Sequence, residues 1–228
     1  MNTLAIDIGG TGLKMLVLDE SGQPTHPAYT APTPRPATPR AIHAVLDELA
    51  KSCPPFDRIS AGFPGIVTAG HTRNAPNLGE GWEDHPLAEE LSARLGQPAR
   101  VANDADIQGY GAIEGNGVEL TITLGTGVGS GLFVDGTLVP NLELGHAPFR
   151  EGRSYEQILG MTGRNQLGHH SWQEALFIAL DQWHRLFSPV QLHLGGGHAQ
   201  TIHRPLPPRT RVVHNRAGLL GGIALWRD

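Results

Sequence analysis

Short hydrophobic runs separated by glycines open the chain and predict paired strands. The segments 4–8 and 13–19 are apolar on either side of a glycine-rich turn, as in a two-stranded hairpin. A further extended segment is predicted at 25–31, and the proline-rich stretch 30–40 predicts a loop. Asp7 is unexpected within this pattern, because a lone carboxylate is rarely buried without a partner.

The segment after the proline-rich loop has apolar residues at helical spacing. Thr38 followed by Pro39 is typical of a helix N-cap with proline at the first helical position. The apolar positions that predict this helix are Ile42, Val45, Leu46 and Leu49.

The remaining hydrophobic pattern alternates between strands and helices. The segment 58–67 predicts a strand and a glycine-proline turn. We predict further strands at 98–104, 190–197 and 210–215, and helices at 85–96, after 104, at 171–187 and at 217–226. This alternation predicts a mixed α/β fold.

The strand–turn–strand pattern at the start occurs a second time at 120–136. With a constant offset of 116 residues, Asp7 falls on Thr123, and we read the match as a duplication rather than as two chance hairpins. Two similar domains are then expected to aim both glycine turns into one cleft. The matched pairs are Leu4–Leu120, Ile6–Ile122, Gly9–Gly125, Leu16–Leu132 and Asp19–Asp135.

Composition excludes several classes of protein. The 228 residues carry a formal net charge of -5 without a basic run, which argues against nucleic-acid and anionic-membrane partners. No apolar run reaches membrane-spanning length, and the chain begins directly with a strand pattern, so we expect no signal peptide and a cytoplasmic location. Cys53 is the only cysteine, and the twelve histidines are scattered, so we expect no metal site from them.

The two glycine turns are candidate anion sites, because backbone amides without a neighbouring Cβ can approach a phosphate closely. Asp7 has two interpretations: it holds Mg²⁺ near phosphates, usually through waters, or it only satisfies the amides of a hairpin turn. The residues that could contact phosphate are Gly9, Gly10, Thr11 and Lys14 in the first turn and Thr123, Gly125, Thr126 and Gly127 in the second.

Asn103 and Asp104 end a predicted strand and offer chemistry for a hydroxyl substrate. Asn103 has both a donor and an acceptor for sugar hydroxyls, and Asp104 is a candidate base near an acceptor hydroxyl. The alternative is that both residues merely cap the next helix.

The motifs DIGGTGLK, GFPG, APNLGEGW, VANDAD, ITLGTGVG, ELGH and LGGG follow one another in the order seen in the ROK family of sugar kinases and sugar-responsive repressors. The resemblance covers nearly the whole chain. It implies the actin-like, ribonuclease H-like two-domain fold. The first domain is expected at 1–102, with 205–228 returning to it, and the second at 103–204.

The resemblance also implies roles for individual residues. The segments from Asp7 to Lys14 and from Thr123 to Gly129 resemble the two phosphate loops, and Gly195, Gly196 and Gly197 resemble the turn near the nucleotide's adenosine. Asp104 resembles the catalytic base beside the sugar-binding Asn103. The other residues that match sugar-binding positions are Glu143, His146 and Glu156.

One departure from the family pattern concerns metal. Most members carry a cysteine-rich zinc motif after the GH pair, whereas this chain reads APFREGRSY without cysteine. His146 is therefore assigned to sugar alone, and no zinc site is expected. In lacking this zinc motif, the chain resembles the polyphosphate glucokinase branch of the family. The shorter chain, without a DNA-binding helical segment ahead of Asp7, disfavours a repressor.

The expected function is transfer of a phosphoryl group from Mg²⁺-bound ATP to a hexose hydroxyl, the 6-hydroxyl of glucose above others. Inorganic polyphosphate is the alternative donor, and a catalytically silent sugar-binding regulator is the alternative of another class. A homodimer is left open. Arginines that could form a polyphosphate track are Arg150, Arg153, Arg164, Arg204, Arg209 and Arg211, but the acidic chain favours ATP.

Overall fold

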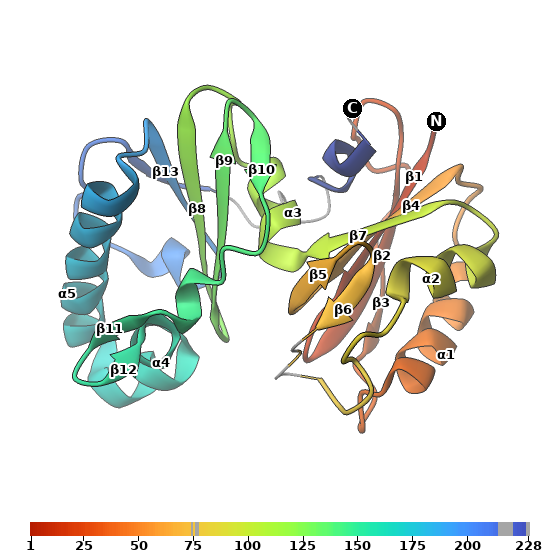
Figure 1. Cartoon of the computed structure of the whole chain (residues 1–228), viewed down its shortest axis with the longest axis horizontal. Coiled ribbons are helices and arrows are strands. Elements are labelled where there is room, and N and C mark those ends of the chain that lie inside the picture. Colours follow the sequence, from red (N-terminus) through yellow and green to blue (C-terminus); the bar gives the residue numbers. More distant parts are fainter. Residues whose placement is uncertain (74, 76–77, 214–220, 227–228) are drawn as a thin grey trace. The chain divides into compact units, whose positions relative to one another are not determined.

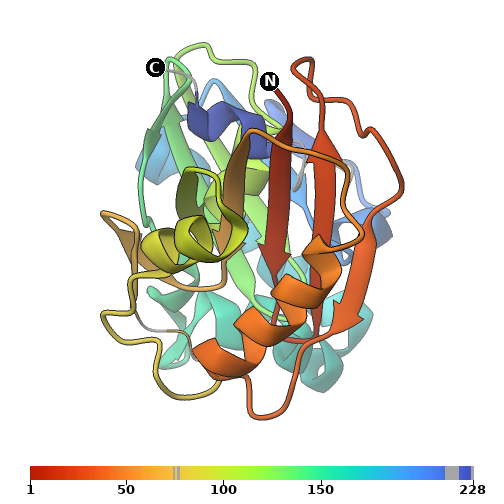
Figure 2. The ribbon, with the colours of Figure 1, turned by 90° about the vertical axis from the view of Figure 1, so that its right-hand side faces the viewer.

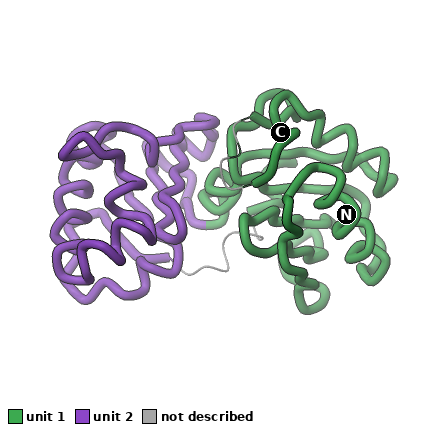
Figure 3. The backbone as a smooth tube through the Cα atoms, turned by 90° about the horizontal axis from the view of Figure 1, so that it is seen from below, with its two compact units in different colours: residues 1–111, 218–228 green, residues 112–217 purple. Residues whose placement is uncertain are grey.

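The computed structural model describes residues 1–73, 75, 78–213 and 221–226. The chain divides into two compact units (Figure 3). Unit 1 comprises residues 1–111 and 218–228, and unit 2 comprises residues 112–217.

Unit 1 is built on a five-stranded sheet with the strand order β3-β2-β1-β4-β7. β1 is antiparallel to β2 and parallel to β4, which is itself parallel to β7. The strands are β1 (Thr3–Ile8), β2 (Gly12–Leu18), β3 (Tyr29–Pro32), β4 (Arg58–Phe63) and β7 (Ala99–Asn103), with a separate hairpin of β5 (Ile66–Thr68) and β6 (His71–Arg73). The helices are α1 (Pro39–Ala50), α2 (Leu87–Leu95), α3 (Asp104–Tyr110) and the 3₁₀ helix η3 (Gly221–Trp226).

The two faces of the unit 1 sheet carry different residues, because successive side chains of a strand point to opposite faces. Leu4, Ile6 and Ile8 belong to the main hydrophobic core of the unit, which also contains buried residues of α1 and α2. Figure 2 shows both helices over the same face of the sheet. Ala5 packs in a smaller cluster with Ile223 of η3 on the other face, and the strand period places Asp7 on that face.

Unit 2 repeats this plan with the strand order β10-β9-β8-β13-β14 (Figure 1). Its sheet strands are β8 (Val118–Leu124), β9 (Val128–Val134), β10 (Thr137–Val139), β13 (Gln191–Gly195) and β14 (Thr210–Val212). The other elements are η1 (Leu144–His146), β11 (Pro148–Arg150), β12 (Arg153–Ser154), α4 (Tyr155–Leu159), α5 (Met161–Phe187) and η2 (Ala199–Thr201). Trp172 and Trp183 of α5 are fully buried in the core of this unit. Among the described residues, no helix is both long and apolar enough to cross a lipid bilayer.

The duplicated topology agrees with the sequence repeat, but one turn differs in length. Ile8 pairs with Leu13 in the first hairpin, whereas the equivalent Leu124 pairs with Val128 in the second. The second turn therefore has one residue fewer, and the gapless offset of 116 residues holds for the first strand of each hairpin alone. The pairs Leu16–Leu132 and Asp19–Asp135, predicted beyond the turn, are out of register by one residue.

Other predicted elements differ in extent. Thr38 does cap α1, accepting a hydrogen bond from the Ala41 amide, with Pro39 at the first helical position. The helix predicted at 171–187 corresponds to the second part of α5, which follows a break at Gly168 where φ and ψ are not helical; the first part, from Met161 to this glycine, was not predicted. The predicted final helix is 3₁₀ over 221–226; its residues 217–220 and the strand residues 214–215 lie outside the described residues.

The compact units end at other residues than the predicted domains. α3, placed in the second domain by the boundary at 102/103, packs against β4, β7 and η3 of unit 1. β14, placed in the first domain by the boundary at 204/205, pairs with β13 of unit 2. Both boundaries between the units therefore lie further toward the C-terminus than predicted, because hydrogen bonding and packing assign α3 to unit 1 and β14 to unit 2.

A buried polar network fixes the beginning of unit 2. Glu119 is 1% exposed, and its carboxylate accepts hydrogen bonds from the amides of residues 114–116. Arg211 donates through Nε to Nδ1 of His193, so the proton of this imidazole lies on Nε2, which donates to Glu119 at 2.9 Å. Burial works against the charged carboxylate, but these donors outweigh it and lower the pKa of Glu119.

Glu119→Gln is expected to lower the free energy of unfolding by about 2–4 kcal/mol, because an amide cannot accept from the same donors without leaving one of them unpaired. The folded pKa of Glu119 lies below its unfolded value of about 4.3, so its stabilisation is complete above that pH and is lost as the pH falls through the folded pKa. Urea unfolding of both proteins at pH 7 and at pH 3.5 measures this. A difference that does not shrink at the lower pH would contradict the assignment to the charged form.

Candidate active site

The first glycine turn joins β1 to β2 and is held by its own backbone and by the loop after β3. The Gly9 amide donates to the Gly12 carbonyl at 3.0 Å, and a Cβ at Gly9 would collide with that carbonyl. Thr33 Oγ1 donates to the Gly9 carbonyl at 2.6 Å, and Arg35 donates to the Gly10 carbonyl at 2.7 Å. The turn is thus fixed with a cation, Arg35, at its rim, which suits an anionic ligand.

Asp7 and Lys14 lie opposite each other on β1 and β2. Lys14 Nζ is 3.2 Å from Asp7 Oδ2, and both side chains are partly exposed. Asp7 therefore has a cationic partner, which answers why a carboxylate is tolerated in this strand. The pair also leaves the Asp7 oxygens accessible from solvent, as a carboxylate that holds a hydrated Mg²⁺ must be.

Asn103 and Asp104 stand at the junction of β7 and α3. Asn103 is the N-cap of α3: its Oδ1 accepts from the amides of Ala105 and Asp106, and its Nδ2 donates to the Gly65 carbonyl at 3.1 Å. Asn103 therefore does cap α3, and this cap by itself does not decide whether Asn103 also contacts a sugar. Asp104 is the first residue of the helix, and its Oδ1 accepts from the Ala105 amide at 2.7 Å.

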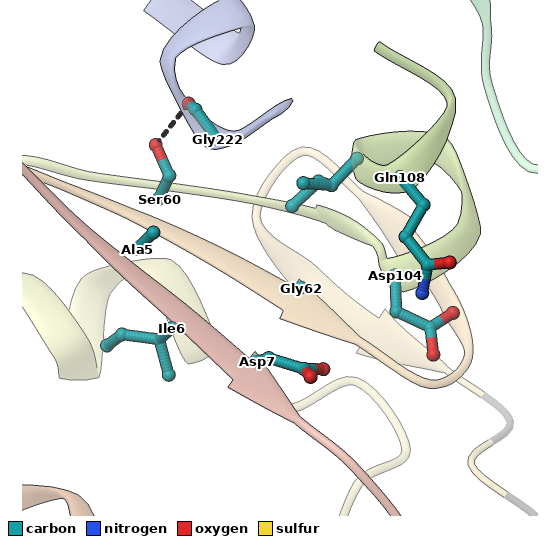
Figure 4. Close-up of a pocket in the computed structure, with 9 residues that line it drawn as sticks. Ala5, Ile6, Asp7, Ser60, Gly62, Asp104, Gln108 and Gly222 are labelled. Atoms are coloured by element: carbon teal, nitrogen blue, oxygen red, sulfur yellow. Dashed lines mark hydrogen bonds between the residues drawn. The ribbon is translucent and has the colours of Figure 1, made fainter. Parts of the chain in front are cut away.

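Asp7 and Asp104 line one pocket of unit 1, although they are far apart in the sequence (Figure 4). The floor includes Ser60 and Gly62 of β4; a Cβ at Gly62 would lie 3.4 Å from the Asp104 Cα, so the strand and the helix start approach closely here. Figure 4 shows the amide end of Gln108 beside the Asp104 carboxylate.

Sequence reasoning missed three residues of this region. Gln108 follows Asp104 by four positions, a spacing that places both on one helix face and could have revealed it. Gly62 lies at the carboxyl end of a strand, where ligands of parallel sheets commonly bind. Arg35, in the proline-rich loop, left no signal, because only the fold places it beside the first glycine turn.

The second glycine turn, between β8 and β9, is anchored to the region around α4. The Gly125 amide donates to the Gly127 carbonyl, and the Met161 amide donates to the Thr126 carbonyl at 3.1 Å. Glu156 Oε2 accepts from the Val128 amide at 3.1 Å, and it lies so close to Gly127 that a Cβ there would collide with it. A side chain at Gly127 would therefore displace the Glu156 carboxylate.

Glu143 and His146 lie near Glu156, all within unit 2. Glu143 Oε2 is 3.4 Å from His146 Nε2, and Glu143 has a left-handed backbone with φ of +44°. Burial, opposed by His146 and reinforced by the charge of Glu156, raises the pKa of Glu143. A partly buried carboxyl group on a strained backbone is typical of a functional site rather than of a stabilising contact. His146 is 47% exposed.

The turn from Gly195 to Gly197 follows β13 and lies beside the end of β8. Gly195 pairs with Thr123, and Gly196, with φ of +85°, is so close to Leu124 that a side chain would collide with its backbone. The amide of His198 donates to the Leu124 carbonyl. The structure thus brings the predicted nucleotide turn next to the second glycine turn.

The sequence model of the ROK family matches residues 3–157 of this chain. The chain belongs to the ROK family. It is 31% identical to the polyphosphate glucokinase of Mycobacterium tuberculosis over 232 residues, which cover 95% of this chain and 88% of the relative.

Two solved structures of ROK proteins bear on the fold. The inorganic polyphosphate/ATP-glucomannokinase of Arthrobacter sp. strain KM superimposes with a TM-score of 0.87 and 32% identity, covering 99% of both chains. A ROK glucokinase of Streptomyces griseus, solved with glucose and AMPPNP, has a TM-score of 0.74 at 22% identity, covering 99% of both chains. The predicted actin-like, ribonuclease H-like fold of the family is confirmed.

Proposed function

We propose that this protein is a sugar kinase that transfers a phosphoryl group from ATP or inorganic polyphosphate to a hexose hydroxyl, with the 6-hydroxyl of glucose as the first candidate. The observation that carries the proposal is the pocket in which Asp7, beside a glycine turn, and Asp104, at a helix start, lie together. Membership of a family whose relatives are named glucokinases supports it. We place the reaction in the cytoplasm.

In the proposed reaction Asp104 accepts the proton of the attacking hydroxyl as the oxygen bonds to phosphorus and the bond to the leaving phosphate breaks. Glu143, His146 and Glu156 of unit 2 would hold the remaining sugar hydroxyls, with the carboxylates accepting and neutral His146 able to donate or accept. Asn103 has used its oxygen to cap α3, so its contribution to the sugar is limited to its amide hydrogens and to fixing Asp104.

The phosphate groups of the donor would bind to the backbone amides of the two glycine turns. Lys14 and Arg35 would add positive charge at the first turn. Mg²⁺ fits near Asp7, which offers the oxygen ligands this ion prefers, and when bound it neutralises charge on the transferred group. In the absence of the ion Lys14 neutralises the Asp7 carboxylate.

A silent sugar-binding regulator is the rival function. Such a protein needs the sugar contacts of unit 2 but has no need for Asp104 or for two phosphate turns. Incubation of the purified protein with glucose, other common hexoses, Mg²⁺ and each donor separates the two. We expect hexose phosphate to accumulate with glucose; sugar binding without turnover on any hexose or donor would favour the regulator.

Two comparisons support inorganic polyphosphate as a phosphoryl donor beside ATP. The relative from M. tuberculosis, which matches 95% of the chain, is named a polyphosphate glucokinase, and the structural neighbour from Arthrobacter is named for both donors. The arginines offer weaker support, because Arg150 and Arg153 both pair with Glu151 and Arg211 pairs with Glu114.

The ionic strength dependence of KM tests the donor. Polyphosphate binding neutralises several charges together, so its KM is expected to rise at least several-fold as salt increases, while the KM for ATP changes little. Steady-state rates with glucose at several salt concentrations, with matched free Mg²⁺, measure both. If the KM values for both donors depend equally and weakly on salt, the arginines do not form a polyphosphate track. The proposal of a sugar kinase would not be affected by that result.

A further inference from the structure

A cluster of two histidines and a glutamate lies in unit 1, on the helix-covered face of the sheet. His43 belongs to α1, His85 lies just ahead of α2, and Glu90 belongs to α2. The active-site pocket is lined by Ala5 and Asp7, which lie on the other face of the same sheet. None of the three residues has a role in the proposed phosphoryl transfer.

The side chains converge with the geometry of a metal shell. His43 Nε2 is 3.5 Å from His85 Nε2 and 3.1 Å from Glu90 Oε2, and the ligand atoms of all three residues lie within 4.8 Å of one another. Tetrahedral zinc with bonds of about 2.0–2.1 Å places neighbouring ligand atoms roughly 3.3 Å apart. Two measured separations thus bracket the spacing that the ion requires before any ligand has moved.

The surroundings favour a cation at this place. His43 is only 1% exposed, and its Nε2 faces both a second imidazole nitrogen and the Glu90 carboxylate, so one potential ligand atom of each residue meets at this point. Neutral imidazole is the form of histidine that binds metal.

We propose that His43, His85 and Glu90 bind a divalent transition-metal ion of the zinc class, with water at the fourth position. Imidazole and carboxylate ligands suit zinc and its neighbours rather than Mg²⁺, which prefers oxygen alone. Glu90 is 38% exposed, so its side is open to solvent for entry of the ion and for the water. Arg94 donates to Asp47 at 2.9 Å, and its Nε is 3.9 Å from Glu90 Oε2, too far for a hydrogen bond.

The ion would link three segments of unit 1. It would join α1 to α2 and to the turn that carries Trp82, whose ring meets the edge of His85 at 5.2 Å between centroids. The Thr72 amide already donates to the His85 carbonyl, so the backbone at this residue is held before metal arrives. The ion would therefore stabilise the packing of these three segments and take no part in phosphoryl transfer.

Titration of protein purified without a metal-affinity tag and stripped with a chelator tests the site. We expect one Co²⁺ per chain with the visible absorption of a tetrahedral complex, quenching of tryptophan fluorescence through Trp82, and displacement by Zn²⁺. Zn²⁺ at about 100 times its Kd is expected to raise Tm by roughly 5–10 °C. Wild-type protein that binds neither ion stoichiometrically would overturn the proposal by itself.

Variants locate the ion. His85→Asn and Glu90→Gln are expected to weaken Co²⁺ binding by about 100-fold or more and to abolish the zinc-dependent rise in Tm. The matched controls are His170→Gln, at an exposed histidine that pairs with Glu174, and Glu89→Gln, at the exposed neighbour of Glu90. Binding that survives both ligand variants, or that is lost in His170→Gln, would place the metal elsewhere and refute the site.

Discussion

Asp104→Asn is expected to lower kcat for sugar phosphorylation by roughly 10²- to 10⁴-fold, the usual contribution of a positioned base. The substitution keeps an oxygen that can accept from the Ala105 amide, so the start of α3 should stay intact. What it removes is the carboxylate that we propose takes the proton of the hydroxyl. Stopped assays at saturating glucose and donor measure kcat, and calorimetry measures the Kd for glucose, which should change much less.

Asp181→Asn is the matched control for this result. Asp181 is an exposed carboxylate on α5 that pairs only with Arg185 among the contacts of the described residues, and its loss should leave kcat unchanged. A fall of only severalfold in kcat for Asp104→Asn would show that Asp104 is a binding or capping residue. The proposal would then lose its base, although the phosphate turns could still bind a donor.

Gly127→Ala is expected to weaken glucose binding by about tenfold to a hundredfold, the worth of one hydrogen bond to a charged group. The new Cβ would collide with the Glu156 carboxylate, which must then leave the Val128 amide and its place in the proposed sugar site. The effect reaches the sugar although Gly127 belongs to a phosphate turn. Calorimetric titration with glucose, without any donor, measures it directly.

Gly125→Ala in the same turn provides the comparison. A Cβ at Gly125 would meet no atom within 4 Å, so the fold and Glu156 should be undisturbed. Both variants are expected to raise the KM for the donor, because both place a methyl group where phosphate approaches backbone amides. Equal glucose affinity in the two variants would contradict a role for Glu156 in binding sugar.

The strands around the glycine turns could be predicted from the sequence because their signals are local. The apolar runs beside Gly9 and Gly125 have strand period and length, and glycine marks the turn between them. Thr38 before Pro39 is likewise a local helix signal, and the cap it predicts is present. Family motifs supplied the order of the elements and the actin-like fold.

What could not be predicted depends on contacts between distant segments. His43 and His85 are separated by 42 residues and converge only because α1 and α2 pack on the same face of the sheet. The expectation that scattered histidines form no metal site considered spacing along the chain alone. Arg35 beside the first glycine turn is another long-range contact, and the one-residue difference between the two hairpin turns became visible only in the strand register.

The most direct test of the kinase account is the phosphorus NMR spectrum of the reaction with glucose, Mg²⁺ and either ATP or polyphosphate. Transfer to the 6-hydroxyl predicts new phosphomonoester resonances, one for each anomer and closely spaced, each split into a triplet by the two protons on carbon 6. These resonances should be strongly reduced at equal times with Asp104→Asn. A doublet would keep the kinase but move transfer to a secondary hydroxyl. Orthophosphate alone, or no change of the donor signals, would contradict the account.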